Sequence, residues 1–264
     1  MIENRYEQTR STGKRPVAAI ILAAGKGTRM DSDRPKVVHE VAGHPMIHWV
    51  VQAVREIGAG PIVLVVGHRA ELVRDVFQGD DDDLVYVTQE PQLGTGHAVG
   101  CAKSVLGDFT GDVFVLAGDG PLIRPATLRR MLDRQQCSGA AVTLATANVD
   151  DPTGYGRIVR DAQGAFKAIV EHAQANEQQQ AIREIYPSYA CFDAGMLFDA
   201  LQKLEPNETT GEYYVTDAPA MLRARDCKVE LVDGIPAEDV LSINTPQQLA
   251  EVELILTARG QEKA

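Results

Sequence analysis

The sequence predicts an α/β fold in which helices cover both faces of a mostly parallel sheet. Two observations carry this prediction. Short apolar, β-prone runs alternate with segments of helical apolar spacing through the first half of the chain. The first of these runs, residues 17–21, leads directly into a glycine-rich turn. The chain has 264 residues, of which 44% are hydrophobic, so it can bury a sizeable core.

The strands and helices of the first half follow from this alternation. Strands are predicted at residues 17–21, 62–66, 84–88 and 112–117, because short, mostly apolar runs are typical of buried parallel strands. Helical spacing predicts helices at residues 45–57, 70–77, 97–106 and 125–136. The acidic segment 80–83 predicts a solvated loop.

The pattern changes after residue 139. Shorter strands predicted at residues 140–146, 156–160 and 166–170 suggest antiparallel additions that carry a second ligand surface. Residues 173–180, rich in Gln and Ala, predict an exposed loop or a short helix. Later elements are predicted as helices at 194–204 and 215–225 and a strand at 228–232. A last helix, 245–257, starts with Thr245 as its cap and Pro246 in its first turn.

Composition and charge exclude several classes of partner. The formal net charge of -11 argues against nucleic acid or an anionic membrane surface as the main partner. No run approaches the ~18 to 20 apolar residues of a membrane-spanning helix. Residues 1–15 are polar and predict a flexible tail rather than a signal peptide. The four cysteines are scattered without C-x-x-C spacing, which predicts reduced thiols in a cytoplasmic protein.

The turn after the first strand has features of a phosphate site. It reads LAAGKGTRM over residues 22–30, and Lys36 follows shortly after. Gly25 and Gly27 allow close approach of the backbone, while Arg29 and Lys36 supply positive charge. The third glycine of G-x-G-x-x-G is missing, and no P-loop motif is present. A purely structural turn is the alternative to nucleotide binding.

Two further segments place polar side chains at the same predicted sheet edge. The strand at 112–117 ends in Gly118-Asp119, and a lone carboxylate beside phosphates is a natural ligand of Mg²⁺. Asn244 could supply a second oxygen, although either residue could equally serve in a turn. Gln89 ends another strand, and its amide offers the donor and acceptor pair that matches a base edge. His97 follows at a helix start, either as a general base or, more simply, as a partly packed residue of the first turn.

Six segments, taken together and in order, resemble the sugar-nucleotidyltransferase family, and within it the uridyltransferase domain of bacterial N-acetylglucosamine-1-phosphate uridyltransferases. The segments are LAAGKGTRM, QLGTGHA, the Gly118-Asp119 pair, DPTGYGRI at 151–158, IVEH at 169–172 and GEYYVTD at 211–217. The resemblance runs from about residue 17 to about residue 253. It implies a Rossmann-like nucleotide-binding sheet with an antiparallel sugar-binding insertion.

The resemblance also implies roles for individual residues. Uridine would be held by Leu22, Ala23, Ala24, Gly25, Gln89, Gly94 and Thr95, with Ala117 and Gly118 beside the ribose. Arg29 and Lys36 would bind the phosphates, and Asp119 and Asn244 would bind Mg²⁺. Gly156 and Glu171 would face the amino-sugar. We therefore expect one domain over residues 16–257, with a nucleotide part at about 16–139, a sugar part at about 140–243 and the closing helix at 245–257.

Two departures from the family lie on the sugar side. An asparagine expected at position 186 is Tyr186, and a lysine expected two residues after Glu171 is Ala173. The Tyr186 ring could line the sugar pocket and stack on the sugar, or it could turn away and pack. The hexapeptide periodicity of the β-helix acetyltransferase carried by bifunctional relatives is absent from this sequence.

The expected reaction joins UTP and N-acetylglucosamine 1-phosphate into UDP-N-acetylglucosamine and pyrophosphate, with Mg²⁺ and in-line attack. Two alternatives stay open: a nucleotidyltransferase for another sugar 1-phosphate or nucleotide, and a non-catalytic protein that binds nucleotide sugars. The sequence leaves the oligomeric state open.

Overall fold

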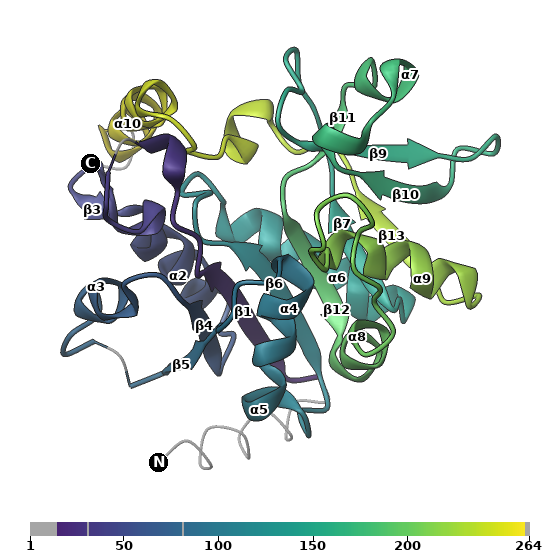
Figure 1. The fold of residues 1–264 in the computed structure, drawn as a ribbon, viewed down its shortest axis with the longest axis horizontal. Coiled ribbons are helices and arrows are strands. Elements are labelled where there is room, and N and C mark those ends of the chain that lie inside the picture. Colours follow the sequence, from purple (N-terminus) through teal and green to yellow (C-terminus); the bar gives the residue numbers. More distant parts are fainter. Residues whose placement is uncertain (1–14, 31, 81, 262–264) are drawn as a thin grey trace.

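The protein is built around a seven-stranded sheet of order β13-β7-β12-β6-β1-β4-β5 (Figure 1). The computed structural model describes residues 15–30, 32–80 and 82–261. The strands are β1 (Val17–Ala23), β4 (Ile62–Val66), β5 (Leu84–Thr88), β6 (Asp112–Ala117), β7 (Val142–Ala145), β12 (Tyr189–Asp193) and β13 (Val229–Val232). Only β12 runs antiparallel to its neighbours within this sheet of the described residues. The predicted α/β fold with a mostly parallel sheet is confirmed.

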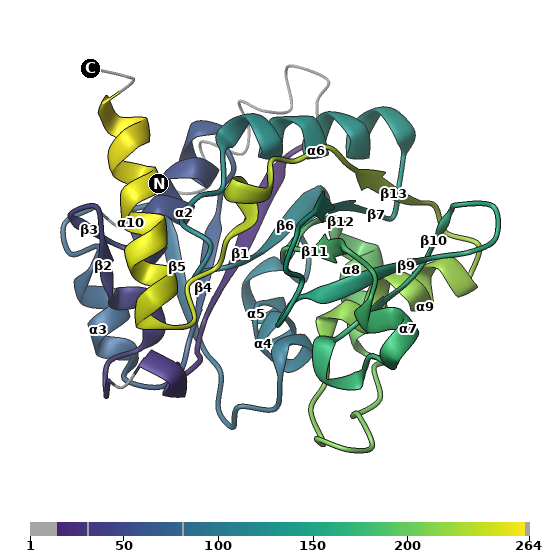
Figure 2. The same ribbon diagram turned by 90° about the horizontal axis from the view of Figure 1, so that it is seen from above.

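Helices cover both faces of this sheet. They are α2 (Met46–Glu56), α3 (Ala70–Asp75), α4 (Thr95–Cys101), α5 (Lys103–Leu106), α6 (Pro125–Ser138), α7 (Glu177–Gln180), α8 (Ala194–Leu201), α9 (Ala218–Ala224) and α10 (Pro246–Gln261). Seen from above, α2 and α6 lie on one side of the sheet, and α4, α5, α8 and α9 on the other (Figure 2). Short 3-10 turns are η2 (Thr28–Met30), η3 (Lys36–Val38), η4 (His172–Gln174), η5 (Val215–Asp217) and η6 (Ala237–Val240).

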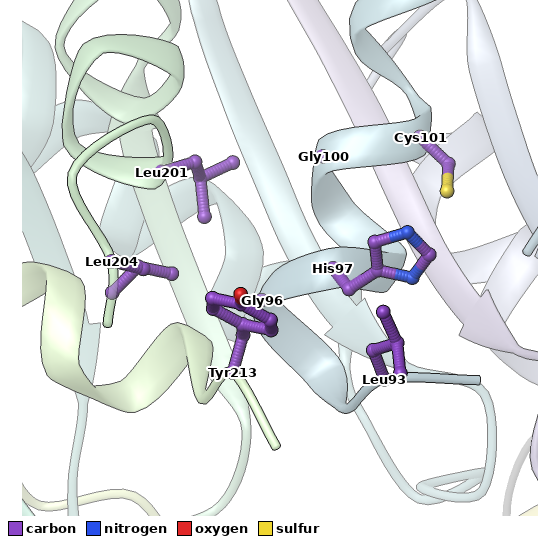
Figure 3. A pocket seen from close by; sticks show the side chains of 8 residues that line it. All are labelled: Leu93, Gly96, His97, Gly100, Cys101, Leu201, Leu204 and Tyr213. Carbon is purple, nitrogen blue, oxygen red and sulfur yellow. The ribbon is translucent and has the colours of Figure 1, made fainter. Parts of the chain in front are cut away.

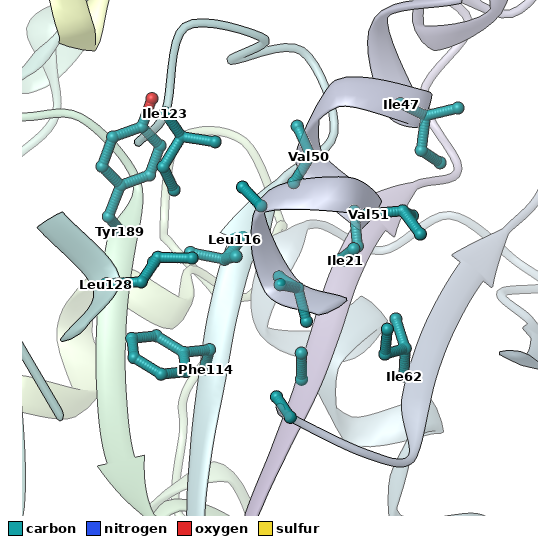
Figure 4. Packing of buried hydrophobic residues seen from close by; sticks show 14 of the residues in the cluster. Ile21, Ile47, Val50, Val51, Ile62, Phe114, Leu116, Ile123, Leu128 and Tyr189 are labelled. Atoms are coloured by element: carbon teal, nitrogen blue, oxygen red, sulfur yellow. The ribbon is translucent and has the colours of Figure 1, made fainter. Parts of the chain in front are cut away.

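The two faces of β1 pack into two separate hydrophobic cores, because successive side chains of a strand point in opposite directions. Ile21 packs with Leu116 beneath Val50 of α2 (Figure 4). Ile20 belongs instead to the cluster under α4, α8 and α9. Both isoleucines are fully buried. This double burial explains why the strand is apolar at nearly every position.

A second, antiparallel sheet of order β10-β9-β11-β8 stands beside the first. Its strands are β8 (Ala147–Asn148), β9 (Gly156–Arg160), β10 (Phe166–Val170) and β11 (Glu184–Tyr186). β11 leads directly into β12, where Tyr189 pairs with Leu116 near the end of β6. The antiparallel sheet therefore reaches the carboxyl edge of the parallel one.

Several predicted elements need correction. Residues 140–146, predicted as part of the antiparallel addition, instead contribute β7 to the central sheet, where β7 pairs antiparallel with β12 and parallel with β13. The predicted helices at 97–106 and 215–225 are each interrupted, giving α4 and α5, and η5 and α9. The sequence analysis missed β11, β12 and the short hairpin of β2 (Glu40–Val41) and β3 (His44–Pro45).

The predicted tail at 1–15 falls, apart from Arg15, outside the described residues, as does Asp81 of the acidic loop. Within the described parts of the chain, none of the helices combines the length and the apolarity needed to cross a membrane.

Candidate active site

A cavity of about 490 Å³ opens where the carboxyl ends of β1 and β6 meet the antiparallel sheet. The predicted site residues that line it are Leu22, Ala23, Ala24, Gly25, Lys36, Gln89, Gly94, Thr95, Ala117, Asp119, Gly156, Glu171, Tyr186 and Asn244. Ligands of open α/β sheets bind at this edge. The structure therefore gathers residues from both sheets and from the C-terminal segment around one space.

Two predicted site residues do not line the cavity. The Gly118 N–H donates to the carbonyl of Leu22 at 3.0 Å, and a Cβ at position 118 would lie 2.9 Å from that oxygen. Gly118 thus lets the ends of β1 and β6 approach closely. Arg29 lies at the rim, where it reaches the site by donating to Asn244 Oδ1 at 3.0 Å.

The charged centre of the cavity joins three distant parts of the chain. Lys36 Nζ donates to the Asp119 carboxylate and, at 2.9 Å, to Asn244 Oδ1. The side chains of Lys36 and Asp119 are each only 17% exposed. Arg29 donates to the same Asn244 oxygen. One carboxylate oxygen and one amide oxygen therefore face a common position that already holds a positive charge.

Local backbone structure places Lys36 and Asn244. Gly27 has φ of 67°, and a Cβ there would lie 2.5 Å from the Lys36 Cβ, so only glycine admits this approach. The Gln248 N–H donates to Thr245 Oγ1 at 3.2 Å, which caps the helix, and the Asn244 N–H donates to Gln248 Oε1 at 2.8 Å, which ties Asn244 to the first turn.

The amide of Asn244 is also oriented by its neighbours. Its Nδ2 donates to Ser242 Oγ at 3.1 Å, which turns Oδ1 toward the two cations. The Ile243 N–H donates to the carbonyl of Asp119 at 3.0 Å, so the C-terminal segment is attached to the loop that carries the carboxylate. The two predicted metal ligands are thereby held side by side.

At another side of the cavity, a glycine loop at residues 94–96 packs against residues 213–215. Gly94 has φ of 96°, and a Cβ there would lie 2.6 Å from the carbonyl oxygen of Tyr213. The Gly96 N–H donates to that oxygen at 2.7 Å, and Thr95 Oγ1 accepts from the Val215 N–H at 3.1 Å. The QLGTGHA and GEYYVTD motifs therefore hydrogen-bond to each other and together form one side of the cavity.

Gln89 and Gln92 project amides into this end of the cavity. Gln89 is 5% exposed, and its Nε2 donates to the carbonyl of Gly94 at 2.9 Å. Gln92 Nε2 donates to the carbonyl of Ala24 and so connects the glycine loop to the turn after β1. The sequence analysis assigned Gln92 no role, although it lies inside a quoted motif.

The wall formed by the antiparallel sheet carries one carboxylate. Thr216 Oγ1 donates to Glu171 Oε1 at 2.8 Å. Burial raises the pKa of Glu171; the Thr216 hydrogen bond opposes this shift, and the nearby charge of Asp217 adds to it. Gly156 packs closely against Ile169, because a Cβ at position 156 would lie 2.8 Å from Ile169 Cγ2; the same Cβ would lie 3.9 Å from Glu171 Oε2.

Tyr186 both packs in the core and lines the cavity, which were the two alternatives considered for its ring. Its side chain belongs to a buried apolar cluster that includes Ile158 and Ile169, and the residue is 6% exposed. It nevertheless lines the cavity. Burial and the charge of Glu171 raise the pKa of its hydroxyl above the ordinary tyrosine range. Ala173, where the resemblance implies a lysine, is exposed in η4 and does not line the cavity.

Further lining residues were missed by the sequence analysis as site residues: Tyr155, Ser188, Glu212, Thr216 and Ser242. Tyr155, Glu212 and Thr216 lie inside motifs quoted above, so the motifs themselves were the available signal. Ser188 lies close to the family departure at Tyr186, whereas Ser242 carried no signal, because its place depends on how distant segments pack.

The donor atoms at the charged centre fit a hard cation. Within the described residues, no three or more His, Cys, Asp or Glu side chains gather as a metal cluster. Asp119 and Asn244 offer two oxygens instead. Mg²⁺ characteristically takes one or two protein oxygens and completes its shell with phosphate oxygens and water. The residues present therefore fit Mg²⁺ held jointly by protein and nucleotide.

The fold and this site define a class of nucleotidyltransferases. Residues 19–212 match the family of the MobA-like NTP transferase domain. That range is more than half of the chain, and the chain belongs to this family. The resemblance drawn from the sequence motifs is confirmed.

Within this family, the chain is similar to bifunctional GlmU proteins. The bifunctional protein GlmU of Pelobacter propionicus is 45% identical over 243 residues, which are 92% of this chain and 53% of that protein. GlmU of Geotalea daltonii is 45% identical over 246 residues, again 92% of this chain and 53% of the relative. The chain thus spans about half the length of the curated relatives it matches.

Two solved structures share the fold. A UDP-glucose pyrophosphorylase complexed with UDP-glucose matches with a TM-score of 0.75 and 19% identity, over 92% of this chain and 99% of that one. A putative glucose-1-phosphate thymidylyltransferase from Bacillus anthracis matches with a TM-score of 0.71 and 17% identity, over 90% and 94% of the two chains. At these identities the likeness establishes the fold, which is the Rossmann-like nucleotidyltransferase arrangement expected above.

Proposed function

We propose that the protein transfers a uridylyl group from UTP to N-acetylglucosamine 1-phosphate, giving UDP-N-acetylglucosamine and pyrophosphate. The observation that carries the proposal is the charged centre, where Asp119 and Asn244 present oxygens to the Lys36 ammonium at the end of β6. The identity to GlmU proteins over 92% of the chain supports this choice of substrates.

The chain's own residues would act by position and charge. The sugar phosphate is already an anionic nucleophile, so attack on the α-phosphorus of UTP requires no general base. Lys36 and Arg29 would neutralise the phosphates, and the turn at 22–25 with Gln89, Gly94 and Thr95 would hold the nucleoside. Asp119 and Asn244 would hold Mg²⁺, which when bound neutralises charge developing on the phosphate oxygens.

The sugar would lie against Gly156, Glu171 and Tyr186, which line the same cavity from the antiparallel sheet. Ala117 would lie beside the ribose at the end of β6. The reacting phosphates would then sit between the two walls, above the charged centre.

A substrate panel tests the proposal. Pyrophosphate release is measured with UTP, CTP, GTP and dTTP, each with N-acetylglucosamine 1-phosphate or glucose 1-phosphate, in Mg²⁺ and after chelation by EDTA. We expect turnover that needs Mg²⁺ and is greatest for UTP with the N-acetylated sugar. Activity that survives complete chelation would contradict the metal role of Asp119 and Asn244.

A second candidate is the same reaction with a different sugar 1-phosphate. It is favoured by Tyr186, a ring that lines the cavity where the resemblance implies an amide. Preference for glucose 1-phosphate in the panel would support it. Tight binding of UDP-sugars with no product for any pair would instead indicate a non-catalytic nucleotide-sugar-binding protein.

A further inference from the structure

His97 contacts the side chain of Gln89 but does not line the substrate cavity. Gln89 Nε2 lies 3.2 Å from His97 Nδ1 and 2.9 Å from the carbonyl oxygen of Gly94. The imidazole lies instead in a separate cavity of about 470 Å³ (Figure 3). Leu93, Cys101 and Tyr213 line that cavity with it. Within the described residues, His97 therefore reaches the substrate cavity through its contact with Gln89.

The hydrogen-bond partners determine how the Gln89 amide is turned. A backbone carbonyl can only accept, so the group that faces Gly94 O must be the amide nitrogen. The same nitrogen faces His97 Nδ1, and it can donate its second hydrogen to Nδ1 when Nδ1 is unprotonated. This arrangement selects the neutral imidazole with its proton on Nε2.

Both hydrogens of the Gln89 amide are then used within the protein. The atom left to a ligand is Oε1, which can only accept a hydrogen bond. A uracil ring carries an N–H donor at N3, whereas the corresponding ring nitrogen of cytosine is an acceptor. An acceptor fixed at this position favours the first base and repels the second.

We propose that His97 is a positioning residue for base selection: it holds the Gln89 amide with its carbonyl oxygen toward the nucleobase and so favours uracil over cytosine. This inference rests on the proposed function, because it takes the cavity beside Gln89 as the base site. Without the acceptor on His97, one amide hydrogen loses its partner, and the orientation of the amide depends on the Gly94 carbonyl alone.

Two substitutions of His97 separate this role from simple packing. His97→Leu keeps an apolar side chain of moderate size and removes the acceptor. His97→Asn can place Oδ1 close to the position of Nδ1 and so restore an acceptor. Dissociation constants for UTP and CTP are measured by calorimetry, alongside kcat and KM for pyrophosphate release.

In His97→Leu we expect the preference for UTP over CTP to fall by about 2- to 13-fold, the range for one hydrogen bond. The KM for the sugar phosphate should stay unchanged, and His97→Asn should recover part of the preference. Equal losses of UTP and CTP binding in His97→Leu, with no recovery in His97→Asn, would overturn the proposal and leave His97 as packing alone.

A second measurement does not depend on activity. Imidazole ¹⁵N chemical shifts should show the Nε2–H tautomer for His97 at pH 8, and the wild-type and Gln89→Ala spectra should differ at Nδ1. An Nδ1–H tautomer would overturn the inference. If the wild type binds UTP with this tautomer but releases no pyrophosphate, the proposed function fails while the positioning role stands.

Discussion

The two walls of the cavity differ in architecture and in charge. The nucleotide wall is made from the ends of parallel strands and their loops, and its polar groups hydrogen-bond to one another across distant segments, as Lys36 does with Asp119 and Asn244. The sugar wall is the face of an antiparallel sheet, where Glu171 is paired with a threonine and Tyr186 packs in an apolar cluster.

The difference indicates that the two walls have different roles, one in catalysis and the other in binding the sugar phosphate. Fixed charges that face the same point are suited to stabilising phosphates during reaction, so changes there should lower kcat. The sugar wall offers isolated hydrogen-bonding groups and a ring, so changes there should alter KM for the sugar phosphate. The predictions below test this division, starting with the largest expected effect.

Asp119→Ala should lower kcat by about 100-fold or more, because it removes a charged ligand of the Mg²⁺ proposed to neutralise the reacting phosphates. The fold should persist, since the hydrogen bond from Ile243 goes to the Asp119 backbone and not to its side chain. Pyrophosphate release and thermal unfolding are measured together. Asp199→Ala, at an aspartate of α8 whose side chain is 42% exposed, serves as the matched control and should retain activity. Near-normal turnover in Asp119→Ala would place the chemistry elsewhere.

Lys36→Met should lower kcat more than Arg29→Met does, although each substitution removes one positive charge. Lys36 is largely buried and contacts both proposed metal ligands, whereas Arg29 is exposed and reaches only Asn244. Exposed charges are screened by water and salt. We expect a loss in kcat of roughly 100-fold for Lys36→Met and roughly 10-fold for Arg29→Met. Equal losses would show that Arg29 moves into the site when substrates bind.

Much of the central sheet could be predicted because its strands are buried on both faces. β1, β4 and β6 are continuous apolar runs, and such runs are visible without knowledge of their partners. β12 was missed because its burial depends on pairing with β6 and β7, and the residues before it, Pro187 and Ser188, resemble a turn. β2 and β3 have two residues each, which is too short for any periodicity.

The candidate site shows the same limit at the level of single residues. Gly27 and Gly94 stood out because glycine in a tight turn is a local signal. The contact of Gln92 with Ala24 and that of Ser242 with Asn244 depend on how loops meet in three dimensions. The resemblance to a family supplied roles for Asp119 and Asn244, which are 125 positions apart in the sequence, and residue chemistry alone left turns as their alternative.

Glu171→Gln should raise KM for the sugar phosphate by about 10-fold or more, as expected for the loss of a hydrogen bond to a charged acceptor. The pH dependence provides a sharper test. Burial raises the pKa of Glu171 above its ordinary value of about 4.3. As the pH falls through this raised pKa, the carboxylate becomes protonated, so the wild-type KM should rise at a pH above 4.3.

The titration of the sugar phosphate itself is the same for both proteins. The ratio of the variant KM to the wild-type KM therefore isolates Glu171, and it should approach 1 on acidification. A ratio that stays constant down to the lowest pH at which both proteins remain folded would show that the ionisation of Glu171 does not govern sugar binding.

Tyr186→Asn tests the sugar wall at the position where this chain departs from its family. The substitution removes a ring that lines the cavity and supplies the amide that the resemblance implies. We expect KM for the sugar phosphate, or the preference between sugars, to change by about 2- to 13-fold per hydrogen bond, while KM for UTP stays constant. Because the ring is also buried, Tyr186→Asn should lower the free energy of unfolding by about 3 kcal/mol, whereas Tyr186→Phe should preserve most of it. If Tyr186→Phe alters the sugar preference as Tyr186→Asn does, the hydroxyl contacts the sugar; if neither does at a temperature where both are folded, Tyr186 serves the core alone.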